Sequence, residues 1–433
     1  MTSLPSSIEI VIVGAGPAGL ACALVLASKG VPFLLLDALS EGQNESRAAV
    51  VHSYTLEQLE AVGVTDTLVS RGIHMGLFTP VADNGSTPFI YIDITGSLAP
   101  YTKYPYALMI AQVDVERILT ARLQELGGVI HRQKHVTKVE DVDGALVVST
   151  DSGESIRAKY VVGADGSKSV VRSSANIAFL DPHTGKPSVA TDDDLQIVLA
   201  DILLDEPLPP SIPKDRLWGN FDKNGFVILI PLKSSIIEPK PNTHLYRFAG
   251  TVPQGTAPHS PEPAYIQRII DERGPGSSHA DSPNLRPKVA FIASGSRYRV
   301  RSGLSVQFAK RMPISGGWVL LAGDAGHIHS PAGGQGMNLG LCDGIRLANA
   351  LIAVTSGVEH ADKAFKKYND VRRPAAQSVI TMVEGMTTLF AGHWLVENWV
   401  VKTLRNWTLR AVFAIPGVQT AAAWRLSGLV HRE

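Results

Sequence analysis

Residues 8–37 read IEIVIVGAGPAGLACALVLASKGVPFLLLD, and this stretch predicts the fold class. Its opening run, residues 8–13, is rich in β-branched side chains and favours a buried parallel strand. A glycine-rich turn follows at residues 14–19, residues 20–29 favour a helix, and the apolar residues 31–36 favour a second strand. A strand, a glycine turn, a helix and a strand in this order form the βαβ unit that binds a dinucleotide. We therefore expect an α/β fold.

The turn has the GxGxxG spacing, and its glycines have physical roles in holding a dinucleotide. Gly14 permits a tight turn, Gly16 lets the backbone approach a pyrophosphate, and Gly19 allows close packing of helix on strand. Ala18, inside the same turn, is expected to contact the cofactor with them. Asp37 closes the second strand and can accept hydrogen bonds from a ribose diol. The turn alone does not distinguish NAD from FAD.

Composition and charge restrict the function classes. The chain has 433 residues, with 40 lysines and arginines against 40 aspartates and glutamates, so its formal net charge is zero. This balance argues against a general nucleic-acid binder, which carries a basic excess. Apolar residues make up 45%, which excludes a disordered chain, and the length suggests two or three domains.

The cysteines and the N-terminus indicate a compartment. The chain has two cysteines, Cys22 and Cys342, so no disulfide framework holds the fold, which suits a reducing compartment. Residues 10–27 are apolar enough to resemble a signal peptide, but residues 1–9 contain no lysine or arginine. We therefore expect a cytoplasmic protein.

A second segment ends in an acidic turn. Residues 128–159 hold three strand-like runs separated by turn signals, which predicts a small antiparallel meander. A further strand over residues 160–164 ends at Asp165 and Gly166. We expect Asp165 to contact the cofactor, although a helix cap is the alternative interpretation.

A third segment is the most informative about the cofactor. An apolar strand over residues 318–322 ends at Gly323 and Asp324, and Asp324 can hold a ribose or ribityl hydroxyl. A loop rich in glycine then leads into a helix that begins near Gln335. Such a loop lets backbone N–H groups approach a flat anionic ring, and a helix N-terminus stabilises the negative charge of a reduced flavin. The loop residues expected at the cofactor are Pro331, Gly334, Gly336, Met337 and Asn338.

The order and context of these three motifs resemble the single-component FAD-dependent aromatic hydroxylases, the family of para-hydroxybenzoate hydroxylase and phenol hydroxylase. The resemblance covers roughly residues 8–180 and 290–375. It implies that Arg47 contacts the phosphate or ribityl region of the flavin and that Gln112 contacts the cofactor. It also implies FAD as cofactor, NAD(P)H as a co-substrate that docks without a domain of its own, and O2 carried as a flavin C4a-hydroperoxide.

The chain departs from this family beside the flavin. The family commonly has an arginine before the TLE sequence, where this chain has Tyr54, and phenol hydroxylases carry an acidic residue close to the position of Arg47, which is followed here by Ala48. A carboxylate base is therefore missing at that point. His52 and Tyr54 are the candidate catalytic groups that would polarise a phenol, and a structural hydrogen bond is the alternative role for each.

The rest of the chain predicts three parts. Residues 1–180 and 287–375 form a discontinuous FAD-binding domain, residues 181–286 an inserted β-sheet substrate domain, and residues 376–433 a helical segment. A flavin hydroxylase needs a dry, mostly apolar cavity. The inserted sheet offers side chains that could line the cavity or form ordinary sheet core, namely Trp218, Phe226, Ile228, Tyr246 and Phe248.

The C-terminal residues are rich in tryptophan and favour helices that pack on the flavin domain over an amphipathic membrane contact. His327 and His329 have no accompanying ligand cluster, so we expect no metal. The sequence thus predicts an FAD-dependent monooxygenase that hydroxylates a phenolic or related aromatic small molecule. The open alternatives are Baeyer–Villiger ring expansion or epoxidation by the same flavin chemistry, and a non-catalytic dinucleotide-fold protein. The oligomeric state stays open.

Overall fold

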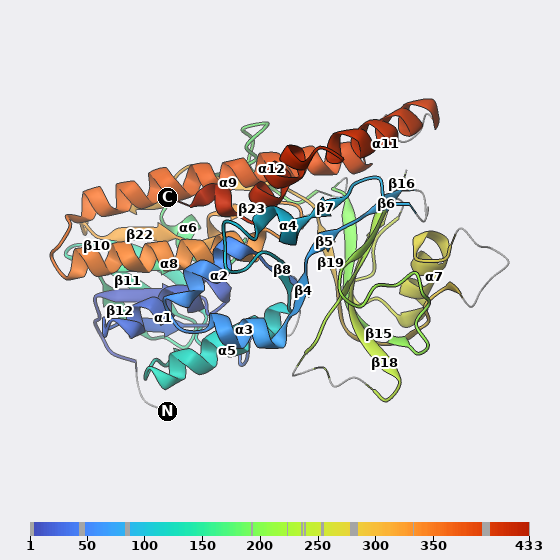
Figure 1. Cartoon of the computed structure of the whole chain (residues 1–433). Helices are drawn as coiled ribbons and strands as arrows, with labels where there is room; N and C mark the ends of the chain where they lie inside the picture. The colour runs from blue at the N-terminus through green and yellow to red at the C-terminus, as the bar shows by residue number, and fades with distance from the viewer. Residues whose placement is uncertain are drawn as a thin grey trace.

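Two six-stranded sheets dominate the part of the chain that the structure describes (Figure 1). The structure is a computed structural model, and the first sheet lies at the left of Figure 1 and the second at the right. The described residues are 4–42, 48–82, 87–191, 194–222, 224–234, 237, 240–252, 255–277, 285–331, 333–391 and 399–432.

The first sheet is mostly parallel and has the strand order β21-β22-β13-β1-β2-β9. Its strands are β1 (Ile10–Val13), β2 (Leu34–Leu36), β9 (Ile130–His131), β13 (Tyr160–Gly163), β21 (Ala309–Arg311) and β22 (Trp318–Leu321). β1, β13 and β22 are neighbours and run parallel, so their carboxyl ends meet at one edge. This register brings together the three turns that the sequence singles out, because each turn directly follows one of these strands.

Alternating side chains of β1 face two different layers. Ile10 and Ile12 pack against the helices α1 (Pro17–Ser28), α5 (Gln112–Glu125) and α8 (Gly336–Thr355). Val11 and Val13 pack against the antiparallel meander of β10 (Val136–Val142), β11 (Ala145–Thr150) and β12 (Ser155–Ala158), next to α6 (Val170–Ser174). The predicted α/β class and the predicted meander are therefore confirmed.

The second sheet has the order β19-β15-β18-β17-β16-β6 and is antiparallel apart from β6. Its strands are β6 (Val81–Ala82), β15 (Gln196–Asp205), β16 (Trp218–Asp222), β17 (Gly225–Pro231), β18 (Thr243–Val252) and β19 (Val289–Arg299). β6 and β19 lie outside residues 181–286, so the sheet takes strands from both sides of that range. β7 (Ile92–Asp93) lies outside both large sheets and pairs with β5 (Leu77–Phe78) in a separate two-stranded sheet.

The two faces of the second sheet have different partners, and the five side chains predicted as possible cavity residues are distributed over both faces. Tyr246, Phe248 and Trp218 pack on the face covered by α7 (Pro263–Arg273). Phe226 and Ile228 lie on the opposite face and line a cavity. The period of two along a strand explains this division, because neighbouring side chains point to opposite faces.

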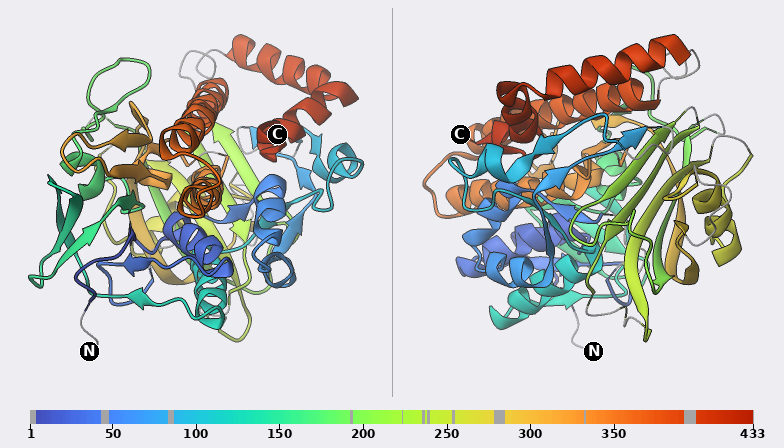
Figure 2. Two further views of the ribbon diagram at one scale, coloured as in Figure 1. Left: turned by 90° about the vertical axis from the view of Figure 1, so that its left-hand side faces the viewer. Right: turned by 45° about the vertical axis from the view of Figure 1, so that its right-hand side comes forward.

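Shorter elements and the C-terminal helices connect the two sheets. The C-terminal helices α9 (Ala361–Ala391), α11 (Trp399–Phe413) and α12 (Pro416–Leu426) lie along one side of the molecule, at the top of Figure 1 and of both views in Figure 2. The expected helical C-terminal segment is therefore confirmed.

The short elements are α2 (Ser53–Glu60), α3 (Thr65–Arg71), α4 (Ile94–Leu98), β3 (Val50–Val51), β4 (Ile73–Met75), β8 (Ala107–Met109), β14 (Phe179–Leu180), β20 (Gly303–Ser305), β23 (His327–Ile328), and the 3-10 turns η2 (Gly323–Ala325) and η3 (Leu429–His431).

Candidate functional site

A cavity of about 770 Å³ joins the carboxyl edge of the first sheet to the inner face of the second. The glycine turn after β1, the turn after β13 and the loop before α8 line one end. Apolar side chains of β15, β16 and β17 line the other end, together with residues of α9 and α12. One continuous space therefore has a polar, glycine-rich half and an apolar half.

The glycine turn is shaped to admit a phosphate group. The backbone of Gly14 has a φ of +101°, and a Cβ there would collide with the carbonyl of Ala164, so glycine is required. Gly19 packs against Gly14 and does not line the cavity. A Cβ on Gly16 would meet no atom within 4 Å and would project into the open space at the start of α1. The absence of that side chain leaves room for a pyrophosphate at the helix N-terminus.

The carboxylate of Asp37 fixes the turn from the end of β2. It accepts hydrogen bonds from the N–H of Ala15 at 2.6 Å and of Leu39 at 2.9 Å, and it pairs with Arg132 at 3.1 Å. These contacts occupy most of the acceptor positions of a carboxylate. A ribose contact at Asp37 stays a prediction.

Asp165 offers an unpaired acceptor beside the turn. Its Oδ2 accepts a hydrogen bond from the N–H of Val171 at 3.1 Å, while its Oδ1 is buried without a hydrogen-bond partner. Burial raises the pKa of this carboxyl group. A buried unpaired oxygen is costly, and a donor from a ligand in the cavity would relieve that cost. The open space at Gly16 and the free oxygen of Asp165 both fit the expected FAD.

A buried charge network fixes the turn after β22. Asp343 on α8 accepts hydrogen bonds from the N–H of Gly323 at 3.0 Å and from Arg372 at 2.6 Å, and it pairs with His327 at 2.7 Å. Burial alone would raise the pKa of Asp343, but the charges of Arg372 and His327 outweigh it and lower that pKa. Asp324, next to the anchored Gly323, is exposed and lines the cavity.

The loop before α8 contributes four of its five predicted residues to the cavity. Pro331, Gly334, Gly336 and Met337 line it, and Asn338 does not. The side chain of Asn338 instead accepts a hydrogen bond from the N–H of His52 at 2.8 Å and donates to the carbonyls of Val50 and Gly334 at 3.0 and 2.7 Å. Asn338 thus ties the helix to β3 and to the loop.

The two predicted catalytic residues have different surroundings. His52 lines the cavity, and its Nε2 lies 3.0 Å from the carbonyl of Gly333. Burial lowers the pKa of His52 to about 4, against the effect of that hydrogen bond, so the ring is neutral and donates to the loop. Tyr54 does not line the cavity, and its hydroxyl accepts a hydrogen bond from Arg346 at 2.7 Å.

The two segments implied by the resemblance are only partly described. Arg47 lies outside the described residues. Gln112 lines the cavity, and its side chain accepts from the N–H of Ala48 at 3.1 Å and donates to Glu116 at 2.8 Å. Gln112 therefore holds the segment that carries Ala48 against α5.

The sequence indicates for His329 only a possible role as a metal ligand, and the structure gives it a different environment. Its Nδ1 lies 2.7 Å from the carbonyl of Ser330, and its buried Nε2 has no hydrogen-bond partner. Burial lowers the pKa of His329 to about 4. The ring lines the cavity with Nε2 as an unprotonated acceptor. Within the described part of the chain, no cluster of three or more possible metal ligands occurs.

Sequence reasoning missed an ion pair in the cavity wall. Arg247 on β18 lines the cavity and binds Asp201 of β15 through two contacts of 2.6 and 3.0 Å. Both side chains are about 1–2% exposed, and Arg247 also lies 3.4 Å from the carbonyl of Ala48. A signal existed, because each residue interrupts an otherwise apolar strand and the two strands are neighbours.

Comparisons with known proteins agree with this geometry. The model of a family described as FAD binding domain matches residues 7–383. An aromatic compound monooxygenase of Bacillus subtilis (strain 168), itself called uncharacterized, is 30% identical over 387 residues, which cover 88% of this chain and 68% of the relative. A 12-dehydrotetracycline 5-monooxygenase/anhydrotetracycline 6-monooxygenase of Streptomyces rimosus subsp. rimosus is 30% identical over 391 residues, which cover 88% and 69%.

A solved structure shows the same fold. The p-nitrophenol 4-monooxygenase of Pseudomonas putida DLL-E4 superposes with a TM-score of 0.80 at 23% identity, and the match covers 99% of this chain and 100% of that one.

Proposed function

The chain belongs to the family of FAD-dependent aromatic monooxygenases, and from this premise we propose that it uses NAD(P)H and O2 to hydroxylate a phenolic small molecule. The observation that carries the proposal is the single cavity with one glycine-rich half and one apolar half. Bound FAD supplies the reduction of O2 and the transfer of one oxygen atom, while the other leaves as water.

The residues of the polar half hold and orient the cofactor in this proposal. Gly16 and the N-terminus of α1 would hold the pyrophosphate of FAD, and Asp165 and Asp324 would accept hydrogen bonds from its ribose and ribityl hydroxyl groups. The N-terminus of α8 lines the cavity and would stabilise negative charge on the flavin ring. His52 donates to Gly333 and so keeps the loop in one position.

The residues of the apolar half orient the substrate and exclude water. Phe221, Phe226 and Ile228 form a dry wall, which favours a neutral aromatic ring. The charge of Arg247 is already neutralised by Asp201, so the described residues of the apolar wall offer no free cation for a substrate carboxylate. We assign the neutral ring of His329, which lines the cavity, as the group that would polarise the phenolic hydroxyl through its unpaired Nε2; that atom is buried in this structure, so the contact requires a turn of the ring toward the cavity.

The first test is cofactor uptake and coupled turnover. We expect the purified protein to be yellow with bound FAD and to oxidise NADPH or NADH faster when a phenol is added. The product needs NMR, because its mass alone does not distinguish ring hydroxylation from ring expansion. A colourless protein that takes up no FAD would overturn the proposal.

Asp324→Ala is the matched test of the site. Removing a charged acceptor should weaken FAD binding by about tenfold to a hundredfold, because such a hydrogen bond contributes roughly 1.5–3 kcal/mol. The fold should persist, since Asp324 is exposed. Titration of the flavin-free protein with FAD, together with circular dichroism, measures both. Unchanged affinity would contradict the assignment of Asp324.

A further inference from the structure

The C-terminal helix α12 forms one end of the apolar half of the cavity. Ala423, Leu426 and Ser427 line the cavity, and Ala423 is 1% exposed. Ala423 belongs to the same buried cluster as Phe221 and Phe226 of the second sheet. A segment near the end of the chain therefore completes a wall that the sheet begins.

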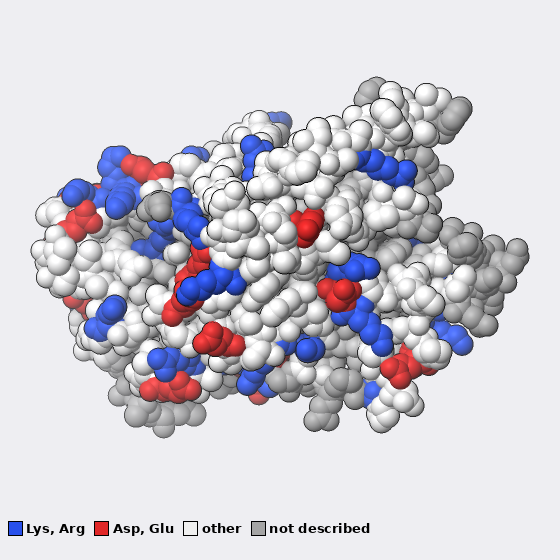
Figure 3. Space-filling view, in the orientation of Figure 1, with Lys and Arg blue, Asp and Glu red and all other residues white. Residues whose placement is uncertain are grey.

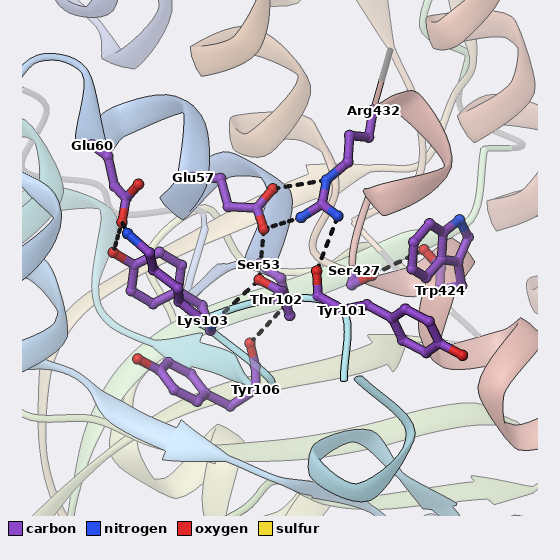
Figure 4. Close-up of polar contacts among 11 residues, drawn as sticks. Ser53, Glu57, Glu60, Tyr101, Thr102, Lys103, Tyr106, Trp424, Ser427 and Arg432 are labelled. Carbon is purple, nitrogen blue, oxygen red and sulfur yellow. Dashed lines mark hydrogen bonds and ion pairs between the residues drawn. The ribbon is translucent and has the colours of Figure 1, made fainter. Parts of the chain in front are cut away.

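Polar contacts fix the segment after α12 against α2 and the loop before β8. Figure 4 shows the guanidinium of Arg432 directed at Glu57 and at the carbonyl of Tyr101, which it approaches to 3.0 Å. Glu57 also accepts a hydrogen bond from Thr102 at 2.7 Å. The ring of Trp424 meets the ring of Tyr101 edge to face at 5.4 Å. These contacts give the segment one defined position.

A second set of contacts ties α12 to the loop before α8. The side-chain amide of Gln335 donates to the carbonyl of Leu426 at 2.8 Å, and the same amide nitrogen lies 3.3 Å from Nε2 of His52. The N–H of Tyr54 donates to the carbonyl of Ser427 at 3.1 Å. Direct hydrogen bonds thus fix the position of α12 relative to the loop before α8 and to α2.

We propose that Ala423 and Leu426 determine how large an aromatic substrate the cavity accepts. The inference rests on the proposed function, which places the reacting ring between the loop before α8 and the second sheet. Ala423 contributes only a methyl group to the end of the cavity, and the larger side chain of Leu426 lines the cavity from the same helix. Because α12 is held at both its inner and outer sides, it cannot yield easily to a bulkier substrate.

Two substitutions move the wall in opposite directions. Ala423→Leu adds three carbons at the cavity end, and Leu426→Ala removes three. Ala421→Leu is the matched control, because Ala421 is exposed on the same helix. The bound-FAD content and circular dichroism of each variant verify that it has folded.

The probes are p-nitrophenol, 1-naphthol and anhydrotetracycline, which differ in the number of fused rings. Their dissociation constants come from the change in flavin absorbance without NAD(P)H, and kcat/KM comes from turnover. Ala423→Leu should weaken binding of anhydrotetracycline by about tenfold or more and that of p-nitrophenol by less than about twofold. Leu426→Ala should shift the preference toward the larger probes, and Ala421→Leu should match the wild type.

The failures of the two proposals can be told apart. Equal losses for all probes in Ala423→Leu, or wild-type binding of every probe by that variant, would overturn the assignment of Ala423 and Leu426. Size-selective binding without any probe-stimulated turnover would overturn the proposed hydroxylation and leave the assignment standing.

Discussion

Arg247 and Asp201 place a complete ion pair in the wall of a largely apolar cavity. Removing two charges from water is costly, and the bidentate geometry offsets that cost only while both partners are present. Ser294 donates a further hydrogen bond to Asp201 at 3.2 Å, which satisfies more of the carboxylate. The pair joins two central strands and, through Ala48, the segment that precedes β3.

Arg247→Met should lower the free energy of unfolding by about 3–5 kcal/mol, because it leaves a buried carboxylate without its cation. The double variant Arg247→Met/Asp201→Leu should lose less than half as much, since no uncompensated charge is left. Urea unfolding of the flavin-free proteins measures both. Strictly additive losses from the two single substitutions would show that the pair contributes no coupling energy.

His329 predicts an acid-dependent loss of stability. Its pKa is about 4 in the folded protein, below the ordinary histidine value of 6.5, so the unfolded chain binds more protons between these values. The free energy of unfolding therefore rises with pH across this window and is lost as the pH falls. One such histidine lowers the free energy of unfolding by roughly 3 kcal/mol at pH 4 relative to neutral pH.

The measurement is urea unfolding at several pH values between 4 and 7, on the flavin-free protein. His329→Phe should flatten the pH dependence, while His360→Phe should leave it unchanged, because the His360 side chain is 80% exposed. Equal slopes in the wild type and His329→Phe would show that His329 titrates normally. His52 has a similarly lowered pKa and keeps part of the slope in either variant.

Residue-level prediction was confirmed only for local backbone geometry, and the contacts of these residues with a cofactor stay a prediction. Gly14 and Gly16 lie in a turn whose spacing encodes its own geometry, and the structure gives them the expected surroundings. Tyr54 shows the limit, because its partner Arg346 lies 292 positions along the chain. No local pattern could show that α2 directs this hydroxyl away from the cavity.

At the scale of elements, the crossing of α1 and α8 depends on small residues. A Cβ on Gly344 would collide with the carbonyl of Ala18, and a Cβ on Gly340 would lie 3.4 Å from the Cβ of Ala18. A Cβ on Gly323, in the turn after β22, would lie 3.0 Å from the same Cβ of Ala18. Both helices begin at the cavity, so their separation sets the shape of the polar half.

Gly344→Ala should therefore destabilise the fold by about 1–3 kcal/mol through overpacking. It should also weaken FAD binding, because displacing α1 moves Ala18 and the glycine turn. Gly385→Ala is the control, since a Cβ at Gly385 in α9 meets no atom within 4 Å. That control should gain roughly 0.5–1 kcal/mol from helix propensity. Thermal unfolding gives the stability of both variants, and FAD titration gives their affinity for FAD. Equal stability and equal affinity of the two variants would contradict the packing argument.

Element-level prediction found the strands but not their faces. The apolar run of β17 indicates a strand, yet Phe226 and Leu229 are equally hydrophobic while only Phe226 lines the cavity. A charged residue gives more information, because Arg247 marks the cavity side of β18. The role of Ala423 had no signal at all, since it depends on how a C-terminal helix docks on α4 and β7.

At the scale of the whole molecule, charge is spread and apolar surface is mostly internal. Blue and red side chains are interspersed on the face shown in Figure 3, which fits the net charge of zero. α8 is long and apolar enough to cross a membrane, but most of it is buried, and it packs on α1 and α9 as a core helix does. Some charged side chains nevertheless lie buried in the cavity wall between the two sheets, among them Asp37 and Arg247.

Because residues next to both large sheets line the cavity, FAD binding should stabilise the two sheets together. At a free concentration of one hundred times its dissociation constant, a ligand adds about 2.7 kcal/mol to the free energy of unfolding. Hydrogen exchange should therefore slow in β1 and β22 and also in β17 and β18, because Arg247 of β18 contacts the carbonyl of Ala48 beside the glycine-rich half of the cavity. Asp324→Ala measured at the same FAD concentration is the control and should keep about half of the stabilisation or less, in both sheets. Protection confined to the first sheet would show that the two sheets unfold separately and that ligand binding in the cavity does not couple them.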